Sequence, residues 1–422
     1  MPTNFRTEIM AGLTTSLTAC YIVVANPSIL VDGGKQFNGV MTATVLVCIL
    51  LTLVLGGYAK LPYLIAPGMG VNAIVAALMV KEHVSLAVAL GLVFWSGVLF
   101  VLVVLTPLKT HITSFVPKNL RAAMTLALGI FLVLIGLKQL GILLEFPFKQ
   151  GWPALGAPNR GWLFGIMGLA TIILLWRMKK PYAIIAGMSL ASFLWWIGGV
   201  GHKELFPQPF VSMPDFSTWM ILDLRHSLKW SFLPFILALF FTDFFDAVAT
   251  LVALSTQLEK DTKEPVGFER GLFVSALATL IPPFFGSSSG TIYLESASGL
   301  KVGGRSGIVA VVAAICFVPF LFFGPLCNAI PDCAIAPALL FIGGSFIVGA
   351  LNLHIRLSEV EEWFPMGLLV IFVIVGSLAK GIFIGLGSYV VLCLLRGKTE
   401  KISLPMVLFS VLGTSFSFVF RL

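Results

Sequence analysis

The chain has 422 residues, of which 58% are hydrophobic and only 11% are charged, and its mean hydropathy is +1.01. Apolar runs of about 20 residues, the length that crosses a bilayer as a helix, recur from one end of the chain to the other. This composition excludes a soluble enzyme and predicts a protein embedded in the lipid bilayer. The net charge of +8 requires no nucleic acid as a partner, because anionic lipid at the membrane surface accounts for it.

Fourteen apolar segments follow one another as predicted transmembrane helices. The first is longer than the core of a signal peptide and lacks a small-residue cleavage site, so we interpret it as a retained span. In chain order, the segments are residues 9–30, 39–58, 64–80, 84–107, 119–144, 162–177, 182–199, 231–255, 267–285, 288–300, 306–328, 334–353, 364–378 and 381–396. A further apolar stretch, residues 403–420, follows in the tail.

Basic residues are distributed unevenly over the turns between these segments. The turns on the side of the N-terminus carry roughly twice as many lysines and arginines as the turns on the opposite side. Since basic residues favour the cytoplasmic side of a membrane, this pattern predicts a multi-pass protein whose N-terminus is cytoplasmic.

Two of the predicted spans are short and interrupted by small residues. The third contains Ala66-Pro-Gly-Met-Gly-Val-Asn72-Ala, and the tenth opens with Gly286-Ser-Ser-Ser-Gly-Thr291. Each is the third of its own set of seven, so we predict an all-α polytopic membrane protein built from two inverted repeats, residues 9–200 and 231–396. An extracytoplasmic linker, 201–230, joins the repeats, and a tail, 397–422, follows them. Ordinary kinks at glycine and proline are the alternative for either segment alone.

Three carboxylates lie inside the apolar spans, where an ionised group costs at least about 2.5 kcal/mol unless it faces protein, water or a ligand. Asp243 and Asp246 are three residues apart and share a helix face, so one of them is expected to hold a proton near neutral pH. Glu295 follows the second interruption and is suited to accept hydrogen bonds from the ring N–H groups of a heterocycle. Asn72, on the matching half-helix, offers both a donor and an acceptor. In the alternative interpretation, these residues bond to neighbouring helices and only hold the bundle together.

Polar residues of the first span, including Tyr21 and Asn26, either line the cavity or serve helix packing. We favour packing, because such residues in membrane helices more often bond to a neighbouring helix or to their own backbone. The sequence contains no Walker motif, dinucleotide fingerprint, zinc signature or nucleophile elbow. We therefore expect no ATP-driven transport, no enzyme activity, no cofactor and no metal.

These motifs resemble the nucleobase:cation symporter-2 family and, within it, the azaguanine-resistance-type (AzgA-like) purine permeases. The resemblance extends along nearly the whole chain and is carried by residues 8–30, 66–73, 243–246, 293–299, 303–307 and 336–340. The eighth span departs from the family pattern, because Asp246-Ala-Val-Ala-Thr stands where relatives typically have Asp-Thr-(Ile/Val)-Gly-Thr. This difference leaves the preferred purine open.

The resemblance implies a core domain (spans 1–4 and 8–11) and a gate domain (spans 5–7 and 12–14) that work by an elevator-like movement. It implies import of adenine, guanine or hypoxanthine by proton symport across a bacterial-type inner membrane. The implied substrate contacts are Asn72, Asp243, Asp246, the backbone near Leu294, and Glu295, with Asp246 and Glu295 also coupling to the proton. A uracil or xanthine carrier, a small-anion carrier of the same fold, and a channel are the alternatives, and a homodimer is left open.

Overall fold

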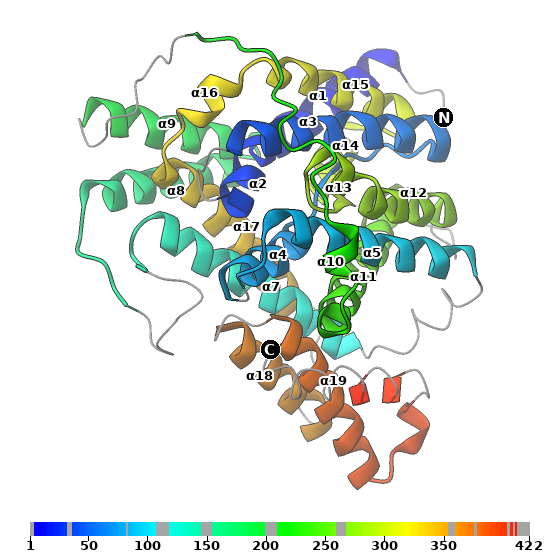
Figure 1. Ribbon diagram of the computed structural model, residues 1–422. Helices are drawn as coiled ribbons and strands as arrows, with labels where there is room; N and C mark the ends of the chain where they lie inside the picture. The colour runs from blue at the N-terminus through cyan, green and yellow to red at the C-terminus, as the bar shows by residue number, and fades with distance from the viewer. Residues whose placement is uncertain are drawn as a thin grey trace.

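The structure is a bundle of helices with one short two-stranded sheet (Figure 1). This computed structural model describes residues 4–31, 36–81, 83–106, 118–144, 154–198, 209–258, 267–352, 359–374, 378–402, 406–407 and 410–411. Among them, seven helices or joined helix pairs are long and apolar enough to cross a membrane, and five shorter apolar helices accompany them. The interrupted segment 290–302 and α18 (Val360–Ile374) bring the total to the fourteen spans that the hydropathy pattern predicts. Residues 403–420 lie mostly outside the described part.

The elements follow the predicted order. The first half contains α1 (Phe5–Ala19), α2 (Ile22–Val31), α3 (Phe37–Val54), the π-helical turn η1 (Leu55–Ala59), β1 (Ile65–Pro67), α4 (Met69–Lys81), α5 (Leu86–Leu105), α7 (Lys118–Gln139), α8 (Arg160–Arg177) and α9 (Ala183–Ile197). The second half contains α10 (Leu224–Ser227), η2 (Trp230–Phe232), α11 (Leu233–Leu258), α12 (Phe268–Leu280), α13 (Pro282–Phe285), β2 (Gly290–Ile292), α14 (Ser296–Val302), α15 (Gly307–Phe317), η3 (Val318–Leu321), α16 (Gly324–Asn328), α17 (Asp332–Asn352), α18, α19 (Leu378–Leu395) and η4 (Thr399–Lys401).

The two halves pack in the same pattern. Helix α1 packs on α14 and α15, and its counterpart α11 packs on α4 and α5. Likewise α8 packs on α9 and α17, and its counterpart α18 packs on α19 and α7. The equivalent strands β1 and β2 pair antiparallel, which requires the two halves to run in opposite directions. The fold is therefore two inverted seven-helix repeats, as predicted.

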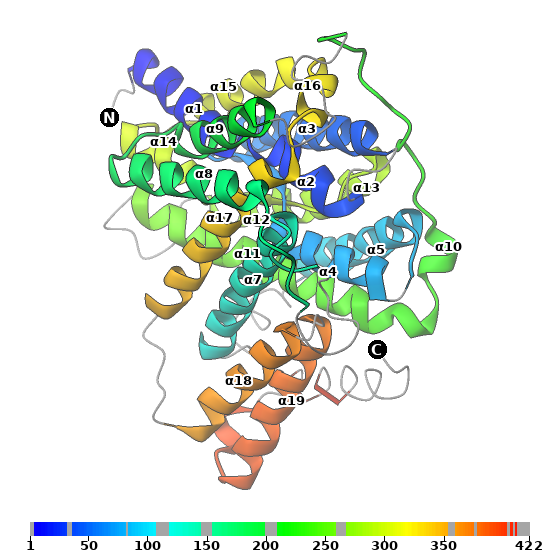
Figure 2. The same ribbon diagram turned by 90° about the vertical axis from the view of Figure 1, so that its left-hand side faces the viewer.

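The helices form two groups, which are the predicted core and gate domains. The core domain consists of α1 to α5 and α11 to α15, and the gate domain of α7 to α9 and α17 to α19. Figures 1 and 2 show α18 and α19 side by side at the bottom of the molecule, away from most of the core. At the centre of the gate, α7 crosses α17 at Gly129 and Gly343, where a Cβ atom on either residue would lie 2.7 Å from the carbonyl oxygen of the other. Only glycine permits this close approach of the two backbones.

The described part of the linker, residues 209–230, lies along the ends of the core helices (Figure 2). Its backbone N–H groups donate to carbonyl oxygens of three core segments: Ser212 to Phe322 (2.9 Å), Met220 to Phe284 (2.7 Å) and Asp223 to Ala87 (2.9 Å). Hydrogen bonds of this kind satisfy both partners at helix ends. The linker is therefore attached to the core along most of its described length.

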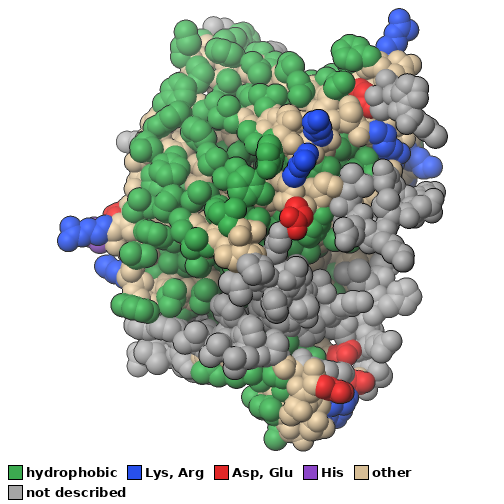
Figure 3. Space-filling model, turned by 90° about the vertical axis from the view of Figure 1, so that its right-hand side faces the viewer, with side chains coloured by type: hydrophobic (Ala, Val, Ile, Leu, Met, Phe, Trp, Pro, Cys, Tyr) green, Lys and Arg blue, Asp and Glu red, His purple; other side chains and the backbone are tan. Residues whose placement is uncertain are grey.

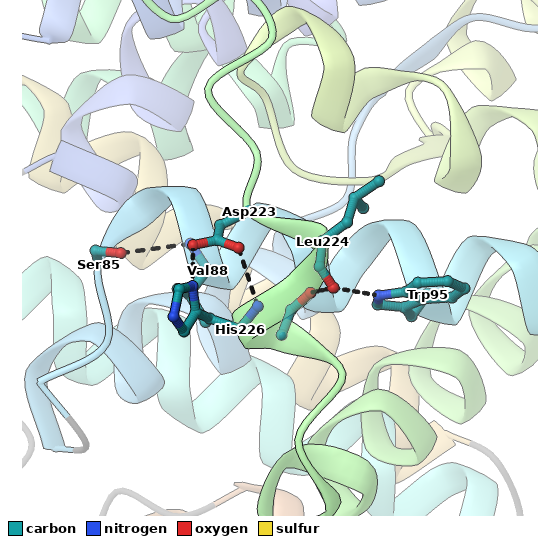
Figure 4. A network of polar contacts seen from close by, with 7 residues as sticks. Ser85, Val88, Trp95, Asp223, Leu224 and His226 are labelled. Atoms are coloured by element: carbon teal, nitrogen blue, oxygen red, sulfur yellow. Dashed lines mark hydrogen bonds and ion pairs between the residues drawn. The ribbon is translucent and has the colours of Figure 1, made fainter.

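The linker ends in α10, which docks on α5 (Figure 4). One carboxylate oxygen of Asp223 accepts the backbone N–H of His226 at 3.0 Å and caps the helix, and the other lies 2.6 Å from Nδ1 of the same histidine. The indole Nε1 of Trp95 donates to the carbonyl oxygen of Leu224 at 3.3 Å. These contacts hold the second half of the linker to the fourth span.

The outside of the bundle is apolar. Figure 3 shows a broad hydrophobic face on which charged side chains are few. Large apolar side chains that point outward occur on both core and gate helices, among them Leu102, Leu174 and Val391. A surface of this composition is stable only in lipid, so the chain is an integral multi-pass membrane protein.

Candidate functional site

The two interrupted spans meet side by side in the core. Strands β1 and β2 are three residues long and pair with Ile65 opposite Ile292, Ala66 opposite Thr291, and Pro67 opposite Gly290. Short half-helices follow the strands, α4 from Met69 and α14 from Ser296. The prediction of two broken spans is therefore confirmed. The strand pair satisfies backbone groups that would otherwise be unpaired at membrane depth.

Asp243 lies on α11, which packs against β2 of this strand pair. Its Oδ1 accepts the hydroxyl of Ser289 at 2.9 Å, and its Oδ2 accepts the hydroxyl of Thr279 at 2.9 Å. The residue is only 4% exposed. Because both of its oxygens accept hydrogen bonds, Asp243 links α11 to α12 and to the segment that precedes β2.

Asp246 and Glu295 have a different environment from Asp243. Asp246 accepts the hydroxyl of Thr291 at Oδ2 (3.0 Å), and Glu295 accepts the hydroxyl of Tyr21 at Oε1 (2.9 Å). Both side chains are only half-buried. No side chain of the described part of the chain donates to the second oxygen of either carboxylate. Each carboxylate thus has one oxygen held in place and one oxygen free to accept a further hydrogen bond.

Asn72 is fully buried in a network of side-chain amides and hydroxyls. Its Nδ2 donates to Oδ1 of Asn26 at 2.6 Å, and its Oδ1 accepts the hydroxyl of Ser288. Nδ2 of Asn26 in turn donates to the hydroxyls of Thr44 (2.6 Å) and Ser287 (3.2 Å). This network joins α2, α3 and α4 to the segment before β2, and it engages both polar atoms of the Asn72 side chain.

Leu294 occupies the bend between β2 and α14. Its side chain is 43% exposed, and its carbonyl oxygen accepts the N–H of Ala297 at 2.9 Å. Asp243 and Asp246 thus bond to residues at or next to β2, Leu294 and Glu295 follow this strand, and Asn72 bonds to the segment before it.

The first span contributes to this site through Tyr21 and Asn26, for which the sequence favours helix packing. It is interrupted, because α1 ends at Ala19 and α2 begins at Ile22. Tyr21 at the interruption reaches Glu295, and Asn26 on α2 reaches Asn72. The sequence signal for this role was the spacing of Thr14, Thr18 and Tyr21, which places three polar residues on one face of a helix.

Among the described residues, no group of three or more histidines, cysteines, aspartates or glutamates could hold a metal ion. The described lysine and arginine side chains make no hydrogen bond to the three carboxylates of the site. The polar groups of the site are therefore carboxylates, hydroxyls and backbone N–H and carbonyl groups.

The chain thus has the fold of a class of polytopic membrane proteins that consist of two inverted seven-helix repeats, each with a broken span. Solved structures of transporters share this fold. The transmembrane domain of a cyanobacterium bicarbonate transporter, BicA, has this fold: it superposes with a TM-score of 0.68 and 15% identity over 91% of this chain and 98% of its own. The particular family follows from the sequence. The model of the permease family (Xan_ur_permease) matches residues 6–384, and the chain belongs to this nucleobase:cation symporter-2 family.

Members of known specificity are similar over nearly their full length. The guanine/hypoxanthine permease PbuO of Bacillus subtilis is 32% identical over 97% of this chain and 96% of its own. The adenine permease AdeP of Escherichia coli is 28% identical over 97% of this chain and 92% of its own.

Proposed function

We propose that the chain imports purine nucleobases, namely adenine, guanine or hypoxanthine, in symport with protons. The observation that carries the proposal is the pair Asp246 and Glu295, each with one oxygen held by a hydroxyl and a second oxygen free among the described residues. A carboxylate oxygen accepts hydrogen bonds from the ring N–H and amino groups of a purine. The same groups, half-buried within a membrane, are suited to bind and release a proton. The specificities of PbuO and AdeP support a purine as the substrate.

Within this proposal, the site residues have separate roles. Glu295 accepts hydrogen bonds from the purine ring, and the backbone at Leu294 faces the base. Asp246 contacts the substrate and exchanges the proton together with Glu295. Asp243 and Asn72 are buried and support the site through their hydrogen bonds to other core residues, because their polar side-chain atoms are already engaged there.

The proposed movement is elevator-like. All the proposed contact residues lie on core helices, and the described linker is bonded to the core, so the site would move as one unit past the gate domain. The excess of basic residues on one side of the membrane supports a cytoplasmic N-terminus in a bacterial-type inner membrane. A homodimer is compatible with the proposal, and the mass of the detergent-solubilised protein tests it.

A small anion is the second candidate substrate, since BicA shares the fold. The site argues against it, because three carboxylates repel an anion and no described lysine or arginine bonds to them. A carrier of uracil or xanthine would use the same carboxylates, and only a comparison of ligands separates it from a purine carrier.

The test combines binding with transport. A ligand that binds only the folded state raises the melting temperature, so the purified protein is screened against adenine, guanine, hypoxanthine, xanthine, uracil and bicarbonate. Proteoliposomes with an imposed pH gradient then accumulate the stabilising base, and a protonophore abolishes the accumulation. Stabilisation by bicarbonate alone, or accumulation that is unaffected by the protonophore, would contradict the proposal.

A further inference from the structure

The hydroxyl of Tyr21 donates to Oε1 of Glu295 at 2.9 Å, although the two residues are 274 positions apart in the chain. We propose that Tyr21 is a positioning residue of the site: it fixes the orientation of the Glu295 carboxylate and stabilises its ionised form. Tyr21 thereby sets the pH below which the site stops binding its ligand. This inference rests on the proposed function, because it assumes that Glu295 binds a purine.

The interruption of the first span places Tyr21 at the level of the site. The α-helical pattern of α1 ends at Ala19, and a tighter turn follows, in which the N–H of Val23 donates to Cys20 and that of Val24 to Tyr21. The side chain of Tyr21 is 3% exposed, so its hydroxyl lies in the protein interior. A buried hydroxyl requires a partner, and the carboxylate of Glu295 provides it.

Close packing of α1 against α14 holds this contact in place. A Cβ atom on Gly299 would lie 2.3 Å from Oγ1 of Thr15 and 2.8 Å from the carbonyl oxygen of Ala11, so only glycine allows the helices to approach this closely. The hydroxyls of Thr18 and Ser298 form a second bond between the same elements at 2.8 Å. The distance between Tyr21 and Glu295 is therefore set by the packing of two helices.

The other ionisable groups that face Glu295 are Tyr293 and Asp246. The hydroxyl of Tyr293 donates to the carbonyl oxygen of Pro67 at 2.7 Å, so its proton is directed away from Glu295. Asp246 is a second negative charge and opposes the ionisation of Glu295. Among the described residues, only Tyr21 donates a side-chain hydrogen bond to the Glu295 carboxylate.

A hydrogen bond to the charged form of a carboxylate favours that form. Without the Tyr21 hydroxyl, Glu295 takes up a proton more readily, and a protonated Glu295 has one fewer acceptor for ring N–H groups. The acidic limb of the binding curve should therefore move to higher pH. A residue that only fills space would weaken binding equally at every pH.

The experiment is a set of Tyr→Phe variants, in which purine binding is titrated from pH 5 to pH 8 with the base that stabilises the wild type. Tyr21→Phe is expected to show the acidic limb at a pH about one unit higher, the shift that corresponds to losing one hydrogen bond to the charged form of the carboxylate, and to bind like the wild type well above that limb. Tyr63→Phe is the matched control, because Tyr63 is fully buried in the same domain and its hydroxyl has no hydrogen-bond partner among the described residues. It should bind like the wild type.

A second substitution covers the case in which Tyr21→Phe does not reach the membrane. Incorporation of 3,5-difluorotyrosine at position 21 keeps the size of the side chain and makes its hydroxyl a stronger donor, so the acidic limb should move to lower pH. An acidic limb that stays at its wild-type position in the fluorinated protein, or in Tyr21→Phe, overturns the inference. A wild-type protein that binds no nucleobase would instead overturn the proposed function.

Discussion

The side-chain amide of Asn72 donates to that of Asn26 across 2.6 Å, deep inside the core. Both residues are fully buried, and together they bond Thr44, Ser287 and Ser288. Through this pair, the first span holds the half-helix α4 and the segment before β2 in a fixed relation. This buried polar network thus links the two broken spans to each other through hydrogen bonds.

Replacing either asparagine by alanine leaves buried partners without a hydrogen bond. Asn72→Ala and Asn26→Ala should each lower the free energy of unfolding in detergent by about 1 to 3 kcal/mol. The double variant should cost less than the sum of the two, because the residues share one bond. Purine binding should weaken in Asn72→Ala without a change in its pH dependence, since no carboxylate is altered. Additive losses in denaturant unfolding would show that the two amides do not interact.

Glu295→Gln should abolish purine uptake and leave insertion into the membrane intact. The amide keeps the size of the side chain, but it replaces one acceptor oxygen with a donor and carries no charge. Uptake of radiolabelled base into proteoliposomes measures the effect. Glu400→Gln, at an exposed position in η4, is the matched control and should transport normally. Wild-type uptake by Glu295→Gln would remove this residue from the site.

The two aspartates of α11 should respond differently to loss of charge. Asp246→Asn should stop accumulation driven by a pH gradient, because a free carboxylate oxygen is lost from the site. Asp243→Asn should keep part of the activity and move the acidic limb of transport to lower pH, since Asp243 and Asp246 share a helix face and loss of one like charge makes the other carboxylate easier to ionise. Initial rates measured from pH 5 to pH 8 test both variants. An acidic limb at higher pH in Asp243→Asn, or full accumulation in Asp246→Asn, would refute this division of roles.

Attachment of the linker to α5 should weaken in acid. The backbone N–H and the ring of His226 hold the pKa of Asp223 below its ordinary value. Folding therefore favours the ionised carboxylate of Asp223. The stabilisation of the folded linker by this group is fully present above the ordinary aspartate pKa of about 3.9 and is lost as the pH falls below it.

The measurement is hydrogen exchange at the amides of Met220 and Asp223, which bond to Phe284 and Ala87. Their protection factors should drop below about pH 4 in the wild type. Asp223→Asn still caps α10 but carries no charge, so its protection should not depend on pH in this range. Equal pH dependence in the two proteins would assign the effect to another group.

The sequence alone predicts the spans, the two interruptions and the acidic residues of the site. All three are local signals. About 20 apolar residues are needed to cross the bilayer, and Ala66-Pro-Gly and Gly286-Ser-Ser-Ser-Gly cannot continue a regular helix. A carboxylate inside an apolar run costs free energy in the bilayer, so its presence indicates a function. The position of each interruption as third in a set of seven is also visible in the chain. It predicts the inverted repeats that the pairing of β1 with β2 confirms.

Only the tertiary structure decided which polar groups meet. Asp243 and Asp246 look equivalent on the helix face, yet among the described residues Asp243 has side-chain donors on both oxygens and Asp246 on one. Tyr21 and Asn26 look like packing residues, yet they bond Glu295 and Asn72. The partners of these side chains come from helices that are distant in the sequence. The rotation and depth of each helix depend on close packing at positions such as Gly299, and no local sequence pattern specifies that packing.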